Sequence, residues 1–217
     1  MTPEIISLFT ASFVTFFVLI DVIGVAPIFA TLTADGSAAW RRSMAIKSVF
    51  VAALIVYAFA FGGAWVLSHM GISIDAFRAA GGILLFLIAL DMVFEKRTER
   101  RESRAEDVLA DADESPGEPD DISVFPMGIP MLAGPGTIAM AMLLMSNSPG
   151  WMERGAVLLA LAANFLVALV VLLGVGPIMR LLGDSIAGGL TRIFGVILAA
   201  LSVQLLIDGI KGAFNLG

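Results

Sequence analysis

The chain of 217 residues contains no cysteine and a single histidine, His69. Without cysteine there is no disulfide, no thiolate nucleophile and no cysteine-ligated metal, and one histidine cannot form a multi-histidine metal site. Charged residues are also few, at 15% where a soluble domain has about 25%. We therefore expect neither a metal centre nor a cofactor.

The chain is instead rich in long apolar stretches. Hydrophobic residues make up 59% of it and the mean hydropathy is +0.95, whereas a soluble domain is about 45–50% apolar. Because a helix of about 20 residues crosses the hydrocarbon of a bilayer, six spans are predicted, at about 5–33, 43–69, 74–95, 122–147, 154–182 and 189–211. The start, MTPEIISLF, lacks the basic region of a cleavable signal peptide, so we expect the first span to be retained. The sequence predicts an all-α integral membrane protein.

Positive charge lies mostly on one side of these spans. The connections after the first, third and fifth spans hold ten basic residues: Arg41, Arg42, Lys47, Lys96, Arg97, Arg100, Arg101, Arg104, Arg180 and Arg192. The other side holds three: Arg78, Arg154 and Lys211. The positive-inside rule then predicts a multi-pass protein of the bacterial inner membrane with both termini periplasmic and the connection 96–121 cytoplasmic.

The connection 96–121 is the one long polar stretch of the sequence. It begins with the basic KRTERRESR and continues with the acidic EDVLADADESPGEPDD. This composition predicts a disordered, charged linker. Its basic part, 96–104, is also suited to anionic lipid headgroups, at roughly 1 kcal/mol for each Lys or Arg near the surface.

Similar patterns on the two sides of the linker indicate an internal repeat. Arg78-Ala-Ala-Gly81-Gly-Ile-Leu in the third span matches Arg192-Ile-Phe-Gly195-Val-Ile-Leu in the sixth. The first and fourth spans are both interrupted by glycine and proline. We infer one three-helix repeat over 1–95 and another over 122–217. Three is odd, so the second repeat enters the membrane from the opposite side, and paired interrupted helices in inverted repeats are the pattern of secondary transporters.

The interruption in the first span contains Asp21, Gly24 and Pro27. An ionised Asp at the centre of a transmembrane helix costs roughly 2.5–3.5 kcal/mol on insertion scales, and such residues usually mark function. Asp21 is therefore a candidate for contact with a substrate ammonium group or with a coupling H⁺ or Na⁺. The alternative is an acid that is protonated or that caps the unwound backbone of its own helix.

The interruption in the fourth span, FPMGIPMLAGPGT, contains Pro130, Gly134, Pro135, Gly136 and Thr137. Glycine permits close backbone approach, and proline removes a donor and stops the preceding helix. The amides freed at the start of the next half-helix suit a carboxylate, by hydrogen bonding and by the helix dipole. We interpret the interruption as a backbone cradle for substrate; the alternative is a kink packed against a neighbouring helix.

Other polar residues within the spans have weaker claims. Asn164 and Gln204 suit hydrogen bonds between helices first and substrate contact second. Arg78 and Arg192 are predicted as snorkelling anchors, with a gating ion pair to Asp75 or Asp184 as the alternative. At the ends of spans we expect interfacial residues: Asp91, Asp208 and His69.

Four segments together resemble the MarC family of bacterial inner-membrane proteins: LIDVIGVAPIFATLT, FRAAGGILLFLIALDMVF, FPMGIPMLAGPGTI and LTRIFGVILAALSVQLLIDGI. The resemblance implies six spans and, as in some members, transport of small neutral amino acids. Val22 stands where the family commonly has proline, so a gentler first interruption is expected. The residues that match the family's motifs are Asp21, Gly24, Pro27, Gly134, Pro135, Gly136, Gln204, Asp208 and Gly209.

Together these features predict a secondary transporter of small zwitterions such as glycine or alanine. Coupling to H⁺ or Na⁺ is a hypothesis that rests on Asp21. The alternatives are a small-solute channel and a membrane factor that transports nothing. An intramembrane enzyme is disfavoured, since no G-x-S-x-G elbow accompanies His69. We expect no nucleic-acid partner, and a homo-oligomer is compatible with the sequence.

Overall fold

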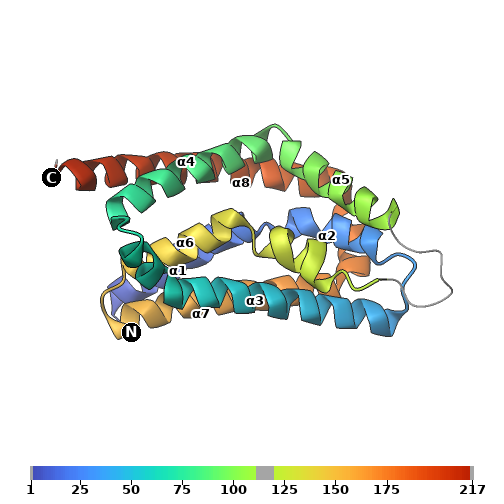
Figure 1. Cartoon of the computed structure of the whole chain (residues 1–217). Coiled ribbons are helices and arrows are strands. Elements are labelled where there is room, and N and C mark those ends of the chain that lie inside the picture. Colours follow the sequence, from blue (N-terminus) through green and yellow to red (C-terminus); the bar gives the residue numbers. More distant parts are fainter. Residues whose placement is uncertain (1, 111–119, 216–217) are drawn as a thin grey trace.

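The computed structural model describes residues 2–110 and 120–215, with the side chains of all but Leu109 and residues 181–185. These residues form helices and no strand (Figure 1). In chain order the helices are α1 (Pro3–Ile20), α2 (Val22–Leu32), α3 (Ala38–His69), α4 (Ile74–Val93), α5 (Lys96–Ala110), the irregular helical segment η1 (Ser123–Leu132), α6 (Pro135–Ser146), α7 (Trp151–Leu173) and α8 (Val175–Phe214).

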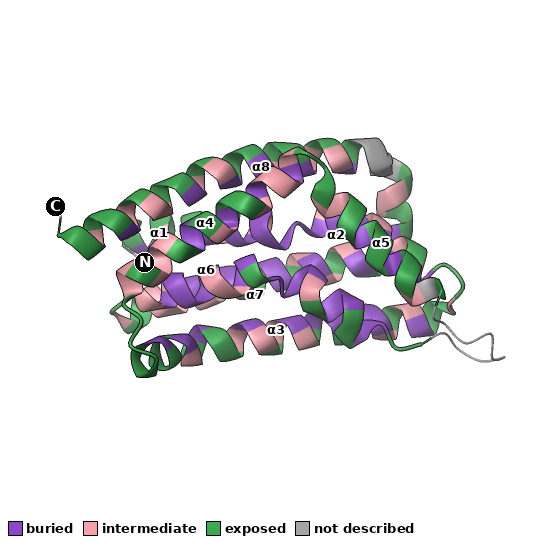
Figure 2. Ribbon diagram, turned by 45° about the horizontal axis from the view of Figure 1, so that its top comes forward, coloured by how far each residue is buried: buried purple, intermediate pink, exposed green. Residues whose placement is uncertain are grey.

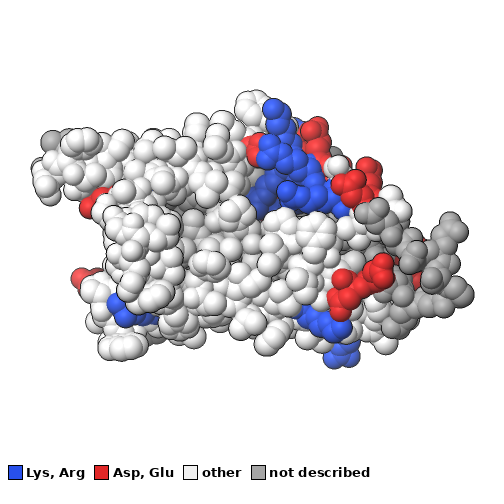
Figure 3. All heavy atoms as spheres, viewed as in Figure 1, with Lys and Arg blue, Asp and Glu red and all other residues white. Residues whose placement is uncertain are grey.

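The prediction of an all-α integral membrane protein is confirmed. Within the described residues, five helical segments are long and apolar enough to cross a membrane, and there are six if η1 and α6 count as one bent span. On the face shown in Figure 3, charged side chains gather in the half of the molecule that carries α5 and at the tip of the other half, and the stretch between them is almost bare. That bare stretch is the surface expected of a protein in hydrocarbon.

The helices pack in pairs that relate the two halves of the chain. The first span contacts the fifth (α1 with α7), the second contacts the fourth (α3 with η1 and α6), and the third contacts the sixth (α4 with α8). Figure 1 shows the first and third spans beginning at the end of the molecule where the chain starts, and the fourth and sixth spans beginning at the opposite end. This is the pairing and direction expected of two inverted three-helix repeats.

The α4–α8 pair is held by close backbone contact at glycines. A Cβ added at Gly82 would lie 2.7 Å from the backbone nitrogen of Leu206, and one added at Gly209 would lie 2.5 Å from that of Ala79. Small residues at helix crossings allow such approach in membranes. Figure 2 shows α8 largely exposed along its length, and its exposed residues Ile193, Val196 and Ile207 are apolar, as suits lipid contact.

Two predictions about the connections are wrong. The fifth span does not continue to residue 182: α7 ends at Leu173, and after the single residue Gly174 the chain is again helical from Val175. Pro177 falls in the first turn of α8, where a missing N–H breaks no helical hydrogen bond, so it does not stop the helix. The start of the linker is not disordered either, because residues 96–110 form α5. Residues 111–119 of the linker lie outside the described residues.

Candidate functional site

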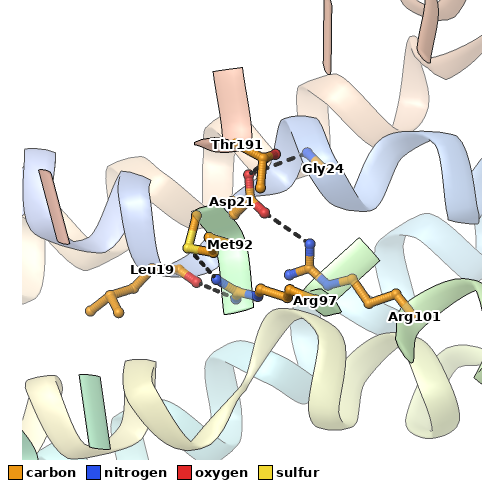
Figure 4. A network of polar contacts seen from close by, with 7 residues as sticks. All are labelled: Leu19, Asp21, Gly24, Met92, Arg97, Arg101 and Thr191. Atoms are coloured by element: carbon orange, nitrogen blue, oxygen red, sulfur yellow. Dashed lines mark hydrogen bonds and ion pairs between the residues drawn. The ribbon is translucent and has the colours of Figure 1, made fainter. Parts of the chain in front are cut away.

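The first interruption is a single residue, Asp21, which ends α1 and begins α2. Its backbone is left-handed (φ 50°, ψ 51°), a conformation that Asp and Asn tolerate better than most side chains. The carboxylate is buried and accepts three hydrogen bonds: Oδ1 from the Gly24 amide (3.4 Å) and the Thr191 hydroxyl (3.1 Å), and Oδ2 from Arg101 Nη1 (2.9 Å) (Figure 4). α1 and α2 together still count as one span, Pro3–Leu32. The expected gentle break is confirmed.

Gly24 is required by this arrangement. A Cβ at position 24 would lie 2.5 Å from Asp21 Oδ2 and 2.8 Å from Thr191 Oγ1. Both distances are shorter than any van der Waals contact allows, so a larger residue would push the carboxylate away from its partners. The glycine of the first motif thus makes room for the acid.

Arg97 donates a hydrogen bond to a backbone carbonyl that the same interruption leaves without a helical partner. Its Nη2 donates to the carbonyl oxygen of Leu19 at 2.8 Å, and its Nη1 lies 3.0 Å from the sulfur of Met92 (Figure 4). The pKa of Arg97 is lowered to about 9, first by burial and then by the positive charge of Arg101. At neutral pH the group is still a cation, so two positive charges lie beside one buried carboxylate.

Both arginines come from α5, in the segment whose composition predicts a disordered linker. The spacing was the missed signal: Arg97, Arg100, Arg101 and Arg104 recur at intervals of three and four residues, which places them on one helical face. Glu95, Glu99 and Glu102 recur in the same way on the opposite side. Composition alone favours disorder, but burial of Ala105 and Arg101 against the spans fixes the helix.

The second interruption is wider than the first. η1 and α6 are bent by 58° at Ala133–Gly134, and within η1 the residues Phe125 and Ile129 have extended backbone and precede cis prolines. The first helical hydrogen bond of α6 runs from the amide of Ile138 to the carbonyl of Gly134 (3.1 Å). No side chain in the described part of the chain caps the earlier amides, so the start of α6 presents free N–H donors.

A cavity of about 250 Å³ opens at this second interruption. The residues predicted to form a cradle all line it, and the arginine face of α5 lines it from the other side (Figure 3 shows the basic side chains gathered there). Its charged lining consists of Asp91, Arg97, Arg100, Arg101 and Arg104, and its interruption residues are Pro130, Gly134, Pro135, Gly136 and Thr137.

The other predicted site residues are not brought to this cavity. Gly24 and Pro27 line a separate one of about 450 Å³, together with the glutamate face of α5. Asn164 donates to the carbonyls of Phe13 (3.0 Å) and Ala160, and so joins α7 to α1. Gln204 is exposed and donates to Asp208 on its own helix at 2.8 Å. Asn164 thus makes the predicted hydrogen bond between helices, whereas the hydrogen bond of Gln204 lies within α8.

Three other charged residues considered from the sequence form ion pairs near the ends of the helices: Arg78, Arg192 and Asp91. Arg78 pairs with Asp75 at 3.0 Å and also donates to Asn147. The pair with Asp75 is the alternative that was considered beside a snorkelling anchor. Arg192 pairs with Glu95, and the side chain of Asp184, the partner considered from the sequence, lies outside the described ones. Asp91 is held by Arg100 at 2.6 Å and lines the cavity, where a purely interfacial position was expected.

Comparison with known proteins settles the family. A family model described as "MarC family integral membrane protein" matches residues 6–214. The chain belongs to the MarC family. A UPF0056 membrane protein of Methanocaldococcus jannaschii is 36% identical over 94% of this chain and 97% of its own length.

Bacterial members of the family are nearly as similar. The UPF0056 membrane protein YvbG of Bacillus subtilis is 35% identical over 93% of each chain. YhcE of Escherichia coli is 32% identical over 93% of this chain and 91% of its own length. No solved structure matches the chain. These names state a membrane location and no activity, so the function has to be argued from the site.

Proposed function

We propose that this MarC-family protein is a secondary transporter of small neutral amino acids such as glycine or alanine. Two inverted repeats with interrupted first helices supply the symmetry by which exchanging the tilts of the halves exposes one site to either side of the membrane. The observation that carries the proposal is the cavity at Gly134–Thr137, where free amides of α6 face the arginines of α5. A substrate carboxylate at that point would satisfy both sets of donors.

The ammonium group of the substrate needs a different account from the one drawn from sequence. Asp21 is already bound by three donors and does not line the cavity. Contact of Asp21 with an ammonium group or a coupling H⁺ or Na⁺ therefore requires Arg101 to leave first. In the state described here Asp91 is the acid that lines the cavity. Arg100 holds it, but unlike Asp21 it borders the space that the substrate would occupy, so we assign the ammonium to it.

We assign the state described here as inward-facing. The positive-inside rule assigns the end that carries α5 to the cytoplasm, and the cavity opens at that end beside α5. In the transport cycle the second interruption would then close as the first one opens, which means that Asp21 would lose Arg101 during each exchange.

Uptake of labelled glycine into proteoliposomes tests the proposal. We expect saturable, gradient-dependent uptake that Asp21→Asn reduces at least tenfold, because the variant cannot exchange a carboxylate between Arg101 and a cation. Arg42→Gln, at an exposed position on α3, serves as the matched control. Uptake that does not saturate would favour a channel, and absence of amino-acid uptake in the wild type would overturn the proposal. Undiminished uptake by Asp21→Asn would remove Asp21 from the mechanism.

A further inference from the structure

We infer that Arg101, which lies outside both repeats, completes an oxyanion site with the N-terminus of α6, and that its ligand is a small free carboxylate. This inference rests on the proposed function, because it names the substrate class of the same cavity. It assigns a binding role to the connecting helix α5, which neither the repeat pattern nor the family motifs include.

The first observation is a buried donor without an acceptor. The Arg101 side chain is 5% exposed and lines the cavity. Its Nη1 is bound to Asp21, whereas its Nη2 is buried and has no hydrogen-bond partner within the described part of the chain. Leaving a buried charged donor unsatisfied is unfavourable, and the cavity that Arg101 lines is the space toward which its guanidinium can turn to meet an acceptor.

The second observation is the start of α6 on the same cavity. Gly136 and Thr137 are buried, line the cavity, and precede the first residue whose amide bonds within the helix. Gly134 at the N-cap supplies no side-chain acceptor for them. The positive end of the helix dipole adds to the attraction for an anion. Guanidinium and amide donors therefore converge on one small space, and both favour a carboxylate oxygen.

The charge balance and size of the cavity select the ligand further. Four arginines line it against one acid, Asp91, and that acid is held by Arg100 through two contacts of 2.6 and 3.4 Å. An added negative charge offsets this excess. A cavity of about 250 Å³ is also smaller than the roughly 300–1,000 Å³ of pockets for drug-sized ligands. A carboxylate with few heavy atoms fits both constraints.

Thermal unfolding of the full chain in detergent tests the inference with acetate, glycine and glycinamide, with chloride keeping the ionic strength constant. At ten times the dissociation constant we expect acetate and glycine to raise Tm by about 3–6 °C. Glycinamide, which has the ammonium group but no carboxylate, should leave Tm unchanged. Equal stabilisation by glycinamide and glycine would overturn the assignment of a carboxylate.

Variants of the ion pair show whether Arg101 binds the ligand. Arg101→Gln leaves Asp21 buried and unpaired, so the double variant Asp21→Asn/Arg101→Gln is the better-balanced form. We expect it to bind acetate at least tenfold more weakly than Asp21→Asn, which keeps Arg101, while the control Arg42→Gln binds acetate as the wild type does. Unchanged acetate affinity in the double variant would overturn the role of Arg101.

Two further experiments distinguish a free carboxylate from a lipid headgroup, and failure of the binding site from failure of the proposed function. If acetate stabilises the protein in phosphatidylcholine nanodiscs but not in phosphatidylglycerol nanodiscs, the oxyanion belongs to a lipid headgroup and the free carboxylate is overturned. Carboxylate binding without amino-acid uptake would defeat the proposed function and leave the site standing. Full uptake by the double variant would defeat the site and leave the proposed function standing.

Discussion

The two interruptions stand at equivalent places in the two halves of the chain, yet one is sealed and the other is open. At Asp21 the freed backbone groups are satisfied by protein: the Gly24 amide by Asp21 itself and the Leu19 carbonyl by Arg97. At Gly134 the free amides of α6 face a cavity instead. Similar sequence patterns have therefore adopted two different states within one molecule.

The difference arises from α5 and α8 rather than from the interruptions themselves. Arg101 of α5 and Thr191 of α8 supply the donors that hold Asp21, and the same face of α5 borders the open cavity. Backbone opened within hydrocarbon must find a partner. Where α5 supplies that partner the interruption is closed, and where it does not, our proposal assigns the partner to a solute. α5, with Thr191 of α8, thus distinguishes the two halves.

The largest effect is expected from Arg101→Gln. It leaves a carboxylate with 0% exposure of its side chain without its cation, and breaking such a buried pair costs roughly 3–5 kcal/mol. We expect a clear loss of thermal stability, measured by the temperature at which the detergent-solubilised protein leaves its monodisperse peak in size-exclusion chromatography.

Asp21→Asn/Arg101→Gln should recover most of that loss, because neither charge is then left alone. The control Arg42→Gln should melt with the wild type. If Arg101→Gln is as stable as the wild type, α5 does not seal the first interruption and the contrast between the two halves fails.

The contrast was only half visible in the sequence. Asp21 and the Gly134–Thr137 segment were identified because charge, glycine and proline are conspicuous in an apolar stretch, where each needs a reason. The six spans and the two interruptions followed from the same physics. Local residue chemistry was sufficient to find both places.

The residues that seal the first interruption could not be found from local residue chemistry. Arg101 lies 80 residues from Asp21 in the chain, in a segment whose composition is typical of disorder. Its helical spacing of arginines was present, but a charged amphipathic helix on a surface has the same pattern. Only the fold reveals that this face points inward, toward a buried carboxylate. The bond from Asn164 to the Phe13 carbonyl is similar, since no motif marks a backbone acceptor.

A smaller effect is expected from Gly24→Ala, and it compares the two interruptions directly. The added methyl group would lie 2.5 Å from Asp21 Oδ2 at the first, whereas at the second the Cβ of Gly134→Ala would meet only the Pro130 carbonyl, at 3.1 Å. Overpacking of this kind costs about 1–3 kcal/mol. Gly24→Ala should therefore melt at a lower temperature than Gly134→Ala. The reverse order would show that the second interruption is the more tightly packed one.

The smallest effect concerns the chain just before the second interruption, where Lys47 pairs with Asp121 at 2.9 Å. Hydrogen bonds from Ser123 and then from Lys47 lower the pKa of Asp121 from 3.8 to about 2. A depressed carboxyl pKa stabilises the folded state above pH 3.8, and that contribution is lost as the pH falls through about 2. Because both side chains are about half exposed, solvent screens the pair and Asp121→Asn should lower Tm only slightly at pH 7.

The Tm values of Asp121→Asn and the wild type should converge as the pH approaches 2. A drop as large as that of Arg101→Gln would mean that this exposed pair holds the second interruption as firmly as the buried pair holds the first, and the asymmetry between the halves would then not lie in their ion pairs.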